Sequence, residues 1–345
     1  MMKSVRHIVL CFLLLVSVYG CTRIPLHERS TKINLFINVE VDLDHDVNLS
    51  YDTTLDPELK GKIEGYIPEY HEVLFYDTVT HDLVTSQIVG STGGHLYVPV
   101  GDYNMVIYGL GTKSTQVKDL YNRLQSDAFT TDITKAMADK FKAIQYNAPA
   151  DSKVSSKGYE DDPIIHEPDH LYVANVFDVN IPAFTGKDIV ITVKAGSSSI
   201  IDIYSLEVLN MKGAENIEKI DAFITGQVKS NYFGIPTRSE DPATLYVTLN
   251  PDPVNQRLWT VFGTFGKLPG NENKIYLDIT VTDSGGGQYR YIYDVTDQFD
   301  DVNNTDNKLV IDGSDINIPK AESGGGGFNP SVDDWDNEEI DVPLS

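Results

Sequence analysis

The chain has almost no cysteine and comparatively few basic residues. Its 345 residues include two cysteines, Cys11 and Cys21. No cysteine follows them that could form a disulfide or a thiolate metal site. The 27 Lys and Arg residues are outnumbered by 51 Asp and Glu residues, which gives a net charge of -24. A chain this acidic repels phosphate backbones, so nucleic acid is excluded as an expected partner.

Long hydrophobic runs are also scarce. The run Ile8–Val16 is nearly unbroken, but it is about half of the roughly 20 apolar residues that span a bilayer. Lys3 and Arg6 precede it, and Cys21 follows a small residue. This order predicts a signal peptide over residues 1–20 and resembles a bacterial lipobox, in which Cys21 would carry the lipid. An ordinary secretory signal cut near a cysteine is the alternative, and either reading predicts export.

Length and hydrophobic pattern predict two β domains. A chain of 345 residues exceeds one ordinary core, since a domain takes roughly 150 residues. Residues 21–30 form a polar stalk, and period-two alternation then opens a β-sandwich domain over residues 31–168. A second β-sandwich is expected over residues 169–322. Its predicted strands are 171–179, 188–193, 200–209, 217–228, 243–249, 259–263, 274–282 and 288–295.

One stretch of the first domain has a helical pattern. Val117, Leu120, Tyr121 and Leu124 recur at helical spacing, and a similar series follows from residue 133. Ala, Lys and Met are frequent there and favour a helix. The sequence therefore predicts a helical insert over residues 115–145.

The segment His166–His170 matches the zinc motif H-E-x-x-H. That motif works on a helix, where both imidazoles share one face. Pro168 lies between the two histidines and disfavours a helix there. We therefore interpret the match as a coincidence within a linker, and expect no metal site.

The acidic residues Asp42, Asp44 and Asp46 have the alternation of a calcium-binding loop. Val47 stands where that loop needs its glycine, and Thr53 stands where it needs glutamate. A solvated acidic loop is the preferred interpretation. No G-x-S-x-G motif is present in the sequence either. The sequence thus predicts no enzyme, no metal and no cofactor.

Aromatic residues leave one binding function open. The chain has 19 tyrosines and two tryptophans, Trp259 and Trp335, which could form a platform for sugars. Most aromatic side chains of β-sandwiches pack in the core or across strands. A surface lipoprotein that binds glycans or nutrients is therefore the alternative function.

Four motifs, spread over nearly the whole chain, carry a resemblance to a known family. Together they resemble the FimB-like anchor lipoproteins of the type V fimbriae made by Bacteroidales, and related lipoproteins of that order. The motifs are the lipobox at Cys21, the turn Val98–Tyr103, the run from Ile217 to Gly263 that closes with Asp294–Gln298, and the tail Phe328–Leu344.

The resemblance implies an all-β fold of two tandem transthyretin-like β-sandwich domains, with the helical insert in the first. It also implies anchoring in the outer membrane through a lipid on Cys21, at the cell surface or on the periplasmic face. The implied role is adhesion or assembly at the base of a fimbria. The expected partner is the fimbrial stalk subunit.

The C-terminal segment 323–345 combines a hinge with an apolar alternation. Gly324–Gly327 is flexible in composition, and Ile340, Val342 and Leu344 then alternate with polar residues or proline. An extended segment of this kind can add to an open sheet edge. It would either complete the second sandwich in cis or pair with a partner subunit. Cis pairing is preferred, because an unpaired apolar strand is an aggregation hazard.

Overall fold

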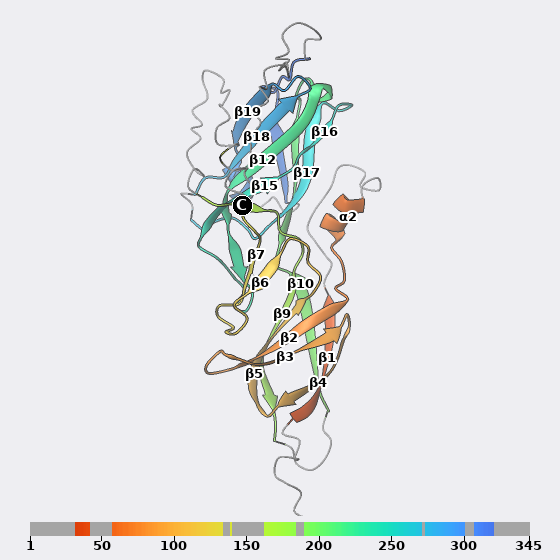
Figure 1. The fold of residues 1–345 in the computed structure, drawn as a ribbon, viewed down its shortest axis with the longest axis vertical. Helices are drawn as coiled ribbons and strands as arrows, with labels where there is room; N and C mark the ends of the chain where they lie inside the picture. Colours follow the sequence, from red (N-terminus) through yellow and green to blue (C-terminus); the bar gives the residue numbers. More distant parts are fainter. Residues whose placement is uncertain are drawn as a thin grey trace, which may run out of the picture.

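The computed structural model describes residues 32–41, 57–133, 139, 162–183, 190–270, 273–300 and 307–320. Strands dominate these residues, and the α-helices α2 (Pro57–Glu64) and α4 (Thr296–Asp300) are short. None of the helices in the described ranges is long and apolar enough to cross a membrane. Two β domains are stacked along the long axis of an elongated molecule (Figure 1). The predicted all-β fold class is confirmed.

The first domain is a seven-stranded barrel. Residues Ile33, Leu35, Ile37 and Val39 of β1 are at most 4% exposed and point into its core, as their alternation predicts. The strand order is β1-β10-β9-β5-β2-β3-β4. These strands are β1 (Lys32–Val41), β2 (Tyr70–Asp77), β3 (Leu83–Gly90), β4 (Gly93–Pro99), β5 (Gly101–Gly109), β9 (Tyr172–Ile181) and β10 (Val190–Ser199).

The strand pairing crosses the domain boundary that was expected at residue 168. Strands β9 and β10 follow that position, yet they pair with β5 and β1 of the first domain. In the other direction, β8 (Ile164–His166) precedes it and pairs with β15 (Pro242–Val247) of the second domain. Sequence alternation identifies strands but not their partners, which here are distant in the chain. After β8, the next strand of the second sandwich is β11 (Asp202–Leu209).

The second domain is a sandwich of two sheets whose inner faces share one apolar core. The first sheet has the order β16-β17-β11-β20, and the second has the order β19-β18-β12-β15-β8. The strands are β11 (Asp202–Leu209), β12 (Ile217–Val228), β15 (Pro242–Val247), β16 (Asn250–Asp252), β17 (Arg257–Thr264), β18 (Tyr276–Asp283), β19 (Gln288–Asp294) and β20 (Lys308–Asp312); a 3-10 turn, η3 (Ala214–Asn216), precedes β12.

The prediction of a helical insert is wrong for residues 115–133. That stretch instead contributes β6 (Gln116–Lys118) and β7 (Asp127–Phe129) to a small sheet with β13 (Ser230–Tyr232) and β14 (Thr237–Arg238). Asp119 has a φ of 57°, a left-handed conformation that a helix does not allow. Val117 and Leu120 pack at the domain interface, so their spacing reflects that contact. Apart from residue 139, the stretch 134–145 lies outside the described residues.

A second apolar core joins the two domains. Leu74, Tyr76, Val106 and Tyr108, on the outer face of β2 and β5, pack against buried side chains of the second domain. Those partners are Ile201, Ile203, Val228, Phe233, Val261 and Phe265, all at most 5% exposed. The domains are therefore joined by a buried interface and not only by the chain that connects them.

Candidate functional site

The site residues predicted from the sequence lie outside the described part of the chain. Cys21 precedes β1, and Ile340, Val342 and Leu344 come after the last described residue, 320. The acidic loop that begins at Asp42 is likewise outside. Lipid attachment and tail pairing therefore stay predictions.

The H-E-x-x-H segment is structural. Both ring nitrogens of His170 have partners, the hydroxyl of Ser199 at 3.0 Å and the carbonyl of Lys62 at 2.7 Å. His166 lies on β8, where its ring meets the edge of the Tyr246 ring. Nowhere in the described ranges do three or more His, Cys, Asp or Glu side chains form a group that could hold a metal.

Glu167, from the same segment, ties the two domains together. Its Oε1 accepts the N–H of Gly263 on β17 at 2.9 Å, and its Oε2 pairs with the Lys62 ammonium of α2 at 3.0 Å. Lys62 also donates to the carbonyl of Val261 on β17, at 3.4 Å. The motif that resembled a zinc site is thus a clasp between α2 and the sandwich, next to the apolar interface.

Asp169 fastens the loop before β6 in the same region. Its carboxylate accepts the backbone N–H groups of Lys113, Ser114 and Thr115 at 2.6, 3.1 and 2.8 Å. Burial alone raises the pKa of Asp169, but the hydrogen bonds from Lys113 and Thr115 outweigh burial and hold the pKa below 3.8. The carboxylate is therefore ionised at neutral pH.

The variant Asp169→Asn is expected to lower the free energy of unfolding by about 1–3 kcal/mol at pH 7. A carboxylate whose pKa is lower in the folded state stabilises the folded protein at pH values above the unfolded-state pKa of about 4. This contribution is lost as the pH falls through the folded-state pKa. The difference between wild type and variant should therefore shrink below pH 4. Urea titrations at pH 7, 4 and 3 measure it. A difference that stays constant to pH 3 would contradict the assignment.

The open edge of β20 is the candidate functional site. Among the residues that the structure describes, β20 is the last strand of its sheet, and it pairs with β11 in parallel register. Asn307 and Gly313 hydrogen-bond toward β11, so alternation turns the N–H and C=O of Val310 outward. The Val310 side chain is 41% exposed on the outer face. Such an edge can accept another strand.

The side chain of Gln298 occupies this edge. The N–H of Val310 donates to Gln298 Oε1 at 2.7 Å, and Gln298 Nε2 donates to the carbonyl of Val310 at 2.9 Å. Gln298 comes from α4, which follows β19 of the opposite sheet. Its amide makes the two bonds that a neighbouring strand would make.

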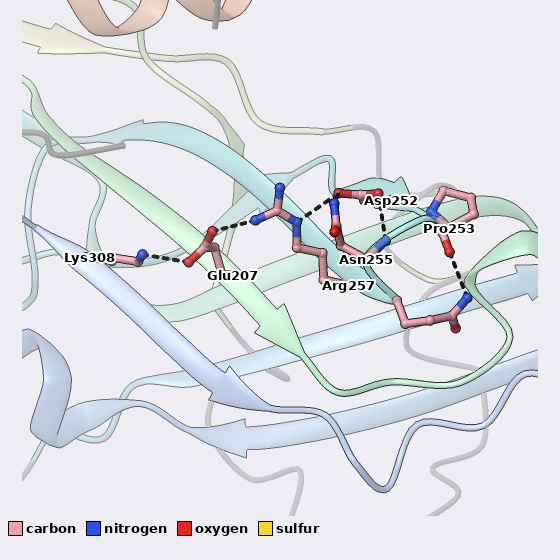
Figure 2. Close-up of polar contacts among 7 residues, drawn as sticks. Glu207, Asp252, Pro253, Asn255, Arg257 and Lys308 are labelled. Atoms are coloured by element: carbon pink, nitrogen blue, oxygen red, sulfur yellow. Dashed lines mark hydrogen bonds and ion pairs between the residues drawn. The ribbon is translucent and has the colours of Figure 1, made fainter. Parts of the chain in front are cut away.

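A row of ion pairs braces the same sheet across its four strands (Figure 2). Glu207 of β11 is 3% exposed; its carboxylate meets Lys308 of β20 at 2.6 Å and Arg257 of β17 at 2.9 Å. Arg257 also pairs with Asp252 of β16 at 2.9 Å. Hydrogen bonds from the Asn255 side chain, and then from Arg257, lower the pKa of Asp252. The row holds the short edge strand β20 against the rest of its sheet.

Sequence reasoning missed this edge. Leu309 and Ile311 alternate with Lys308, Val310 and Asp312, a period-two signal that would have identified β20. Nothing in the sequence pairs Gln298 with Val310, because that contact exists only once the sandwich has closed.

Comparison with known proteins gives a family and a fold. The family described as a domain of unknown function, DUF5119, matches residues 60–248, more than half of the chain. No curated protein matches. A candidate adhesin from Bacteroides ovatus is 18% identical with a TM-score of 0.57, covering 88% of this chain and 99% of its own.

A second solved structure is the fimbrial anchor protein Mfa2 from Porphyromonas gingivalis. It is 13% identical with a TM-score of 0.47, covering 81% of this chain and 90% of its own. The fold shared with the candidate adhesin from Bacteroides ovatus, over 99% of that chain, confirms the resemblance predicted from the sequence as a likeness of fold.

Proposed function

The chain belongs to the DUF5119 family, and we propose that it is a fimbrial anchor or fimbria-associated assembly subunit of the cell envelope. Its work is adhesion or assembly and not catalysis. The supporting observation is the architecture: two β domains joined by a buried interface, with an open strand edge at β20. The fold shared with a candidate adhesin agrees with this role.

The proposed attachment to the outer membrane is a lipid on Cys21. Residues 22–31 separate that cysteine from β1, so acyl chains at Cys21 would hold the barrel close to the membrane. The proposed partner is the fimbrial stalk subunit. The proposed strand for pairing is the tail segment with Ile340, Val342 and Leu344, which we place at the β20 edge in cis.

Lipid attachment is tested first. Mass spectrometry of the protein from outer membranes should find acyl chains on Cys21, and Cys21→Ser should remove the protein from that fraction. Pull-down of the intact lipoprotein from detergent-solubilised outer membranes should then copurify the stalk subunit. An unmodified Cys21, or a protein free in the medium, would refute the anchor. Recovery of glycan or nutrient transporters in place of fimbrial subunits would favour the alternative function.

Tail pairing is tested by deletion of residues 324–345 in the otherwise complete chain. Pairing in cis predicts a lower melting temperature, because the second sandwich would lose an edge strand. Unchanged melting together with lost fimbrial attachment would show that the tail pairs with a partner subunit.

A further inference from the structure

We infer that the Gln298 side chain is a displaceable guard of the β20 edge. By this we mean that its amide occupies the place where a strand would add to β20, until that strand displaces it. The inference rests on the proposed tail pairing and adds its regulation. Its occupant is the tail of this chain, through Ile340, Val342 and Leu344.

The chemistry of the contact supports displacement by a strand. A glutamine side chain ends in a primary amide, whose C=O accepts and whose NH2 donates hydrogen bonds, as the C=O and N–H of a backbone strand do. At 2.7 and 2.9 Å it satisfies both outward groups of Val310. A strand added to β20 would need the same two groups, so strand and guard exclude each other.

The backbone of α4 is fixed independently of the Gln298 side chain. Thr296 is 4% exposed; its hydroxyl accepts the N–H of Ile275 at 2.9 Å, and its own N–H donates to Asp294 at 3.0 Å. The Phe299 ring packs 4.8 Å from the Tyr204 ring. Gln298 can therefore leave the edge by rotation about its side-chain bonds, without movement of α4 or loss of the core.

The tail can reach this edge. Residues 321–345 lie beyond the described chain, and Asn317, just before them, still forms a bridge with Lys212 of the same domain. The 20 residues from position 320 to position 340 span at most about 66 Å when extended. No other chain is required to supply the strand.

Pro343 sets the orientation of the added strand. Proline has no N–H and is tolerated in an edge strand when that position faces solvent. With Pro343 facing outward, alternation turns the backbone groups of Ile340, Val342 and Leu344 toward β20. The tail would then satisfy Val310 and leave a proline on the new outer edge, which blocks further strand addition.

The barrel contains a matched control. The Gln87 amide makes the same two-point contact with the backbone of Tyr97, at 3.0 and 3.2 Å. There it fills the gap where β3 and β4 separate after the pair Gly90–Gly93. Gln87→Ala removes an equivalent contact in the other domain, where the tail is not expected to bind.

Hydrogen exchange in the full-length chain tests the guard. The readout is protection of the backbone amides in a peptide covering residues 338–345. Gln298→Ala is expected to slow their exchange about three- to tenfold, the effect of about one net hydrogen bond removed from the competitor. Gln298→Asn, whose amide is one methylene too short, should behave like Gln298→Ala. Gln87→Ala should leave tail exchange as in wild type.

Three other outcomes of the exchange experiment would contradict the inference, and they can be told apart. A tail that is protected, and equally so, in wild type and Gln298→Ala would overturn the guard and leave tail pairing intact. A tail without protection in wild type and in both Gln298 variants would overturn the guard and cis pairing together. Slower tail exchange in Gln87→Ala as well would mean that the effect is not specific to β20. None of these three results affects the proposed lipid anchor, which has its own test.

Discussion

Replacing Asp278 by alanine is expected to lower the free energy of unfolding by about 3–5 kcal/mol, because the Arg290 guanidinium is then buried without its carboxylate. Arg290 Nε lies 2.9 and 3.0 Å from the two carboxylate oxygens of Asp278. The two side chains are 8% and 1% exposed. Denaturant titration of wild type and variant measures the loss. A change under about 1 kcal/mol would contradict this account of the pair.

Two further variants separate the cost of burying an unpaired charge from the contribution of the ion pair itself. Lys274→Ala removes an exposed pair with Asp294, 3.9 Å apart, and should change stability by less than about 1 kcal/mol. Replacing both Asp278 and Arg290 with leucine removes both buried charges together. That double variant should regain most of the stability lost in Asp278→Ala, since apolar replacements of buried ion pairs are often neutral.

Local alternation made the strand content predictable. In β1, Ile33, Leu35, Ile37 and Val39 are all buried, as their period-two spacing indicates. The same signal located most strands of the second domain. It reports which face of a strand is buried, and that information is present in a few consecutive residues.

Strand partners were not predictable, because they depend on contacts between distant residues. Tyr172–Ile181 reads equally well as the first strand of a second domain or as the strand that pairs with Gly101–Gly109. The spacing of apolar residues also led to a wrong prediction of secondary structure where those residues are buried against another domain. Val117 and Leu120 have helical spacing, yet they are held by the domain interface and by a left-handed residue between them, Asp119.

Only part of the candidate site could be predicted from the sequence. The objection to a zinc site at His166–His170 came from Pro168 and from flanking residues that do not favour a helix, and the structure places His170 and Glu167 in contacts that join domains. The guard at Val310 needs a side chain from α4 to reach a strand of the opposite sheet. Side-chain contacts between elements that are separate in the sequence leave no local pattern.

The domain interface gives the second large expected effect. Phe233→Ala should lower the free energy of unfolding by about 3–5 kcal/mol, the usual range for a buried phenylalanine. Phe233 is fully buried, and its ring lies 5.6 Å from the Tyr108 ring of β5. The Asn175 side chain of β9 donates to its carbonyl at 3.0 Å. Two strands of the barrel thus hold Phe233, β5 at its ring and β9 at its backbone carbonyl.

Because Phe233 contacts both domains, its loss should also separate their unfolding. Calorimetry is expected to show one transition for wild type and two for Phe233→Ala, with the barrel and the sandwich melting apart. Val254→Ala, at a side chain 90% exposed, should leave a single transition with stability changed by less than about 0.5 kcal/mol. One shared transition in Phe233→Ala would mean that the Glu167 clasp is enough to couple the domains. Adding Glu167→Ala to Phe233→Ala should then divide the transition, since the clasp at β17 and the apolar contact at β5 both cross the interface.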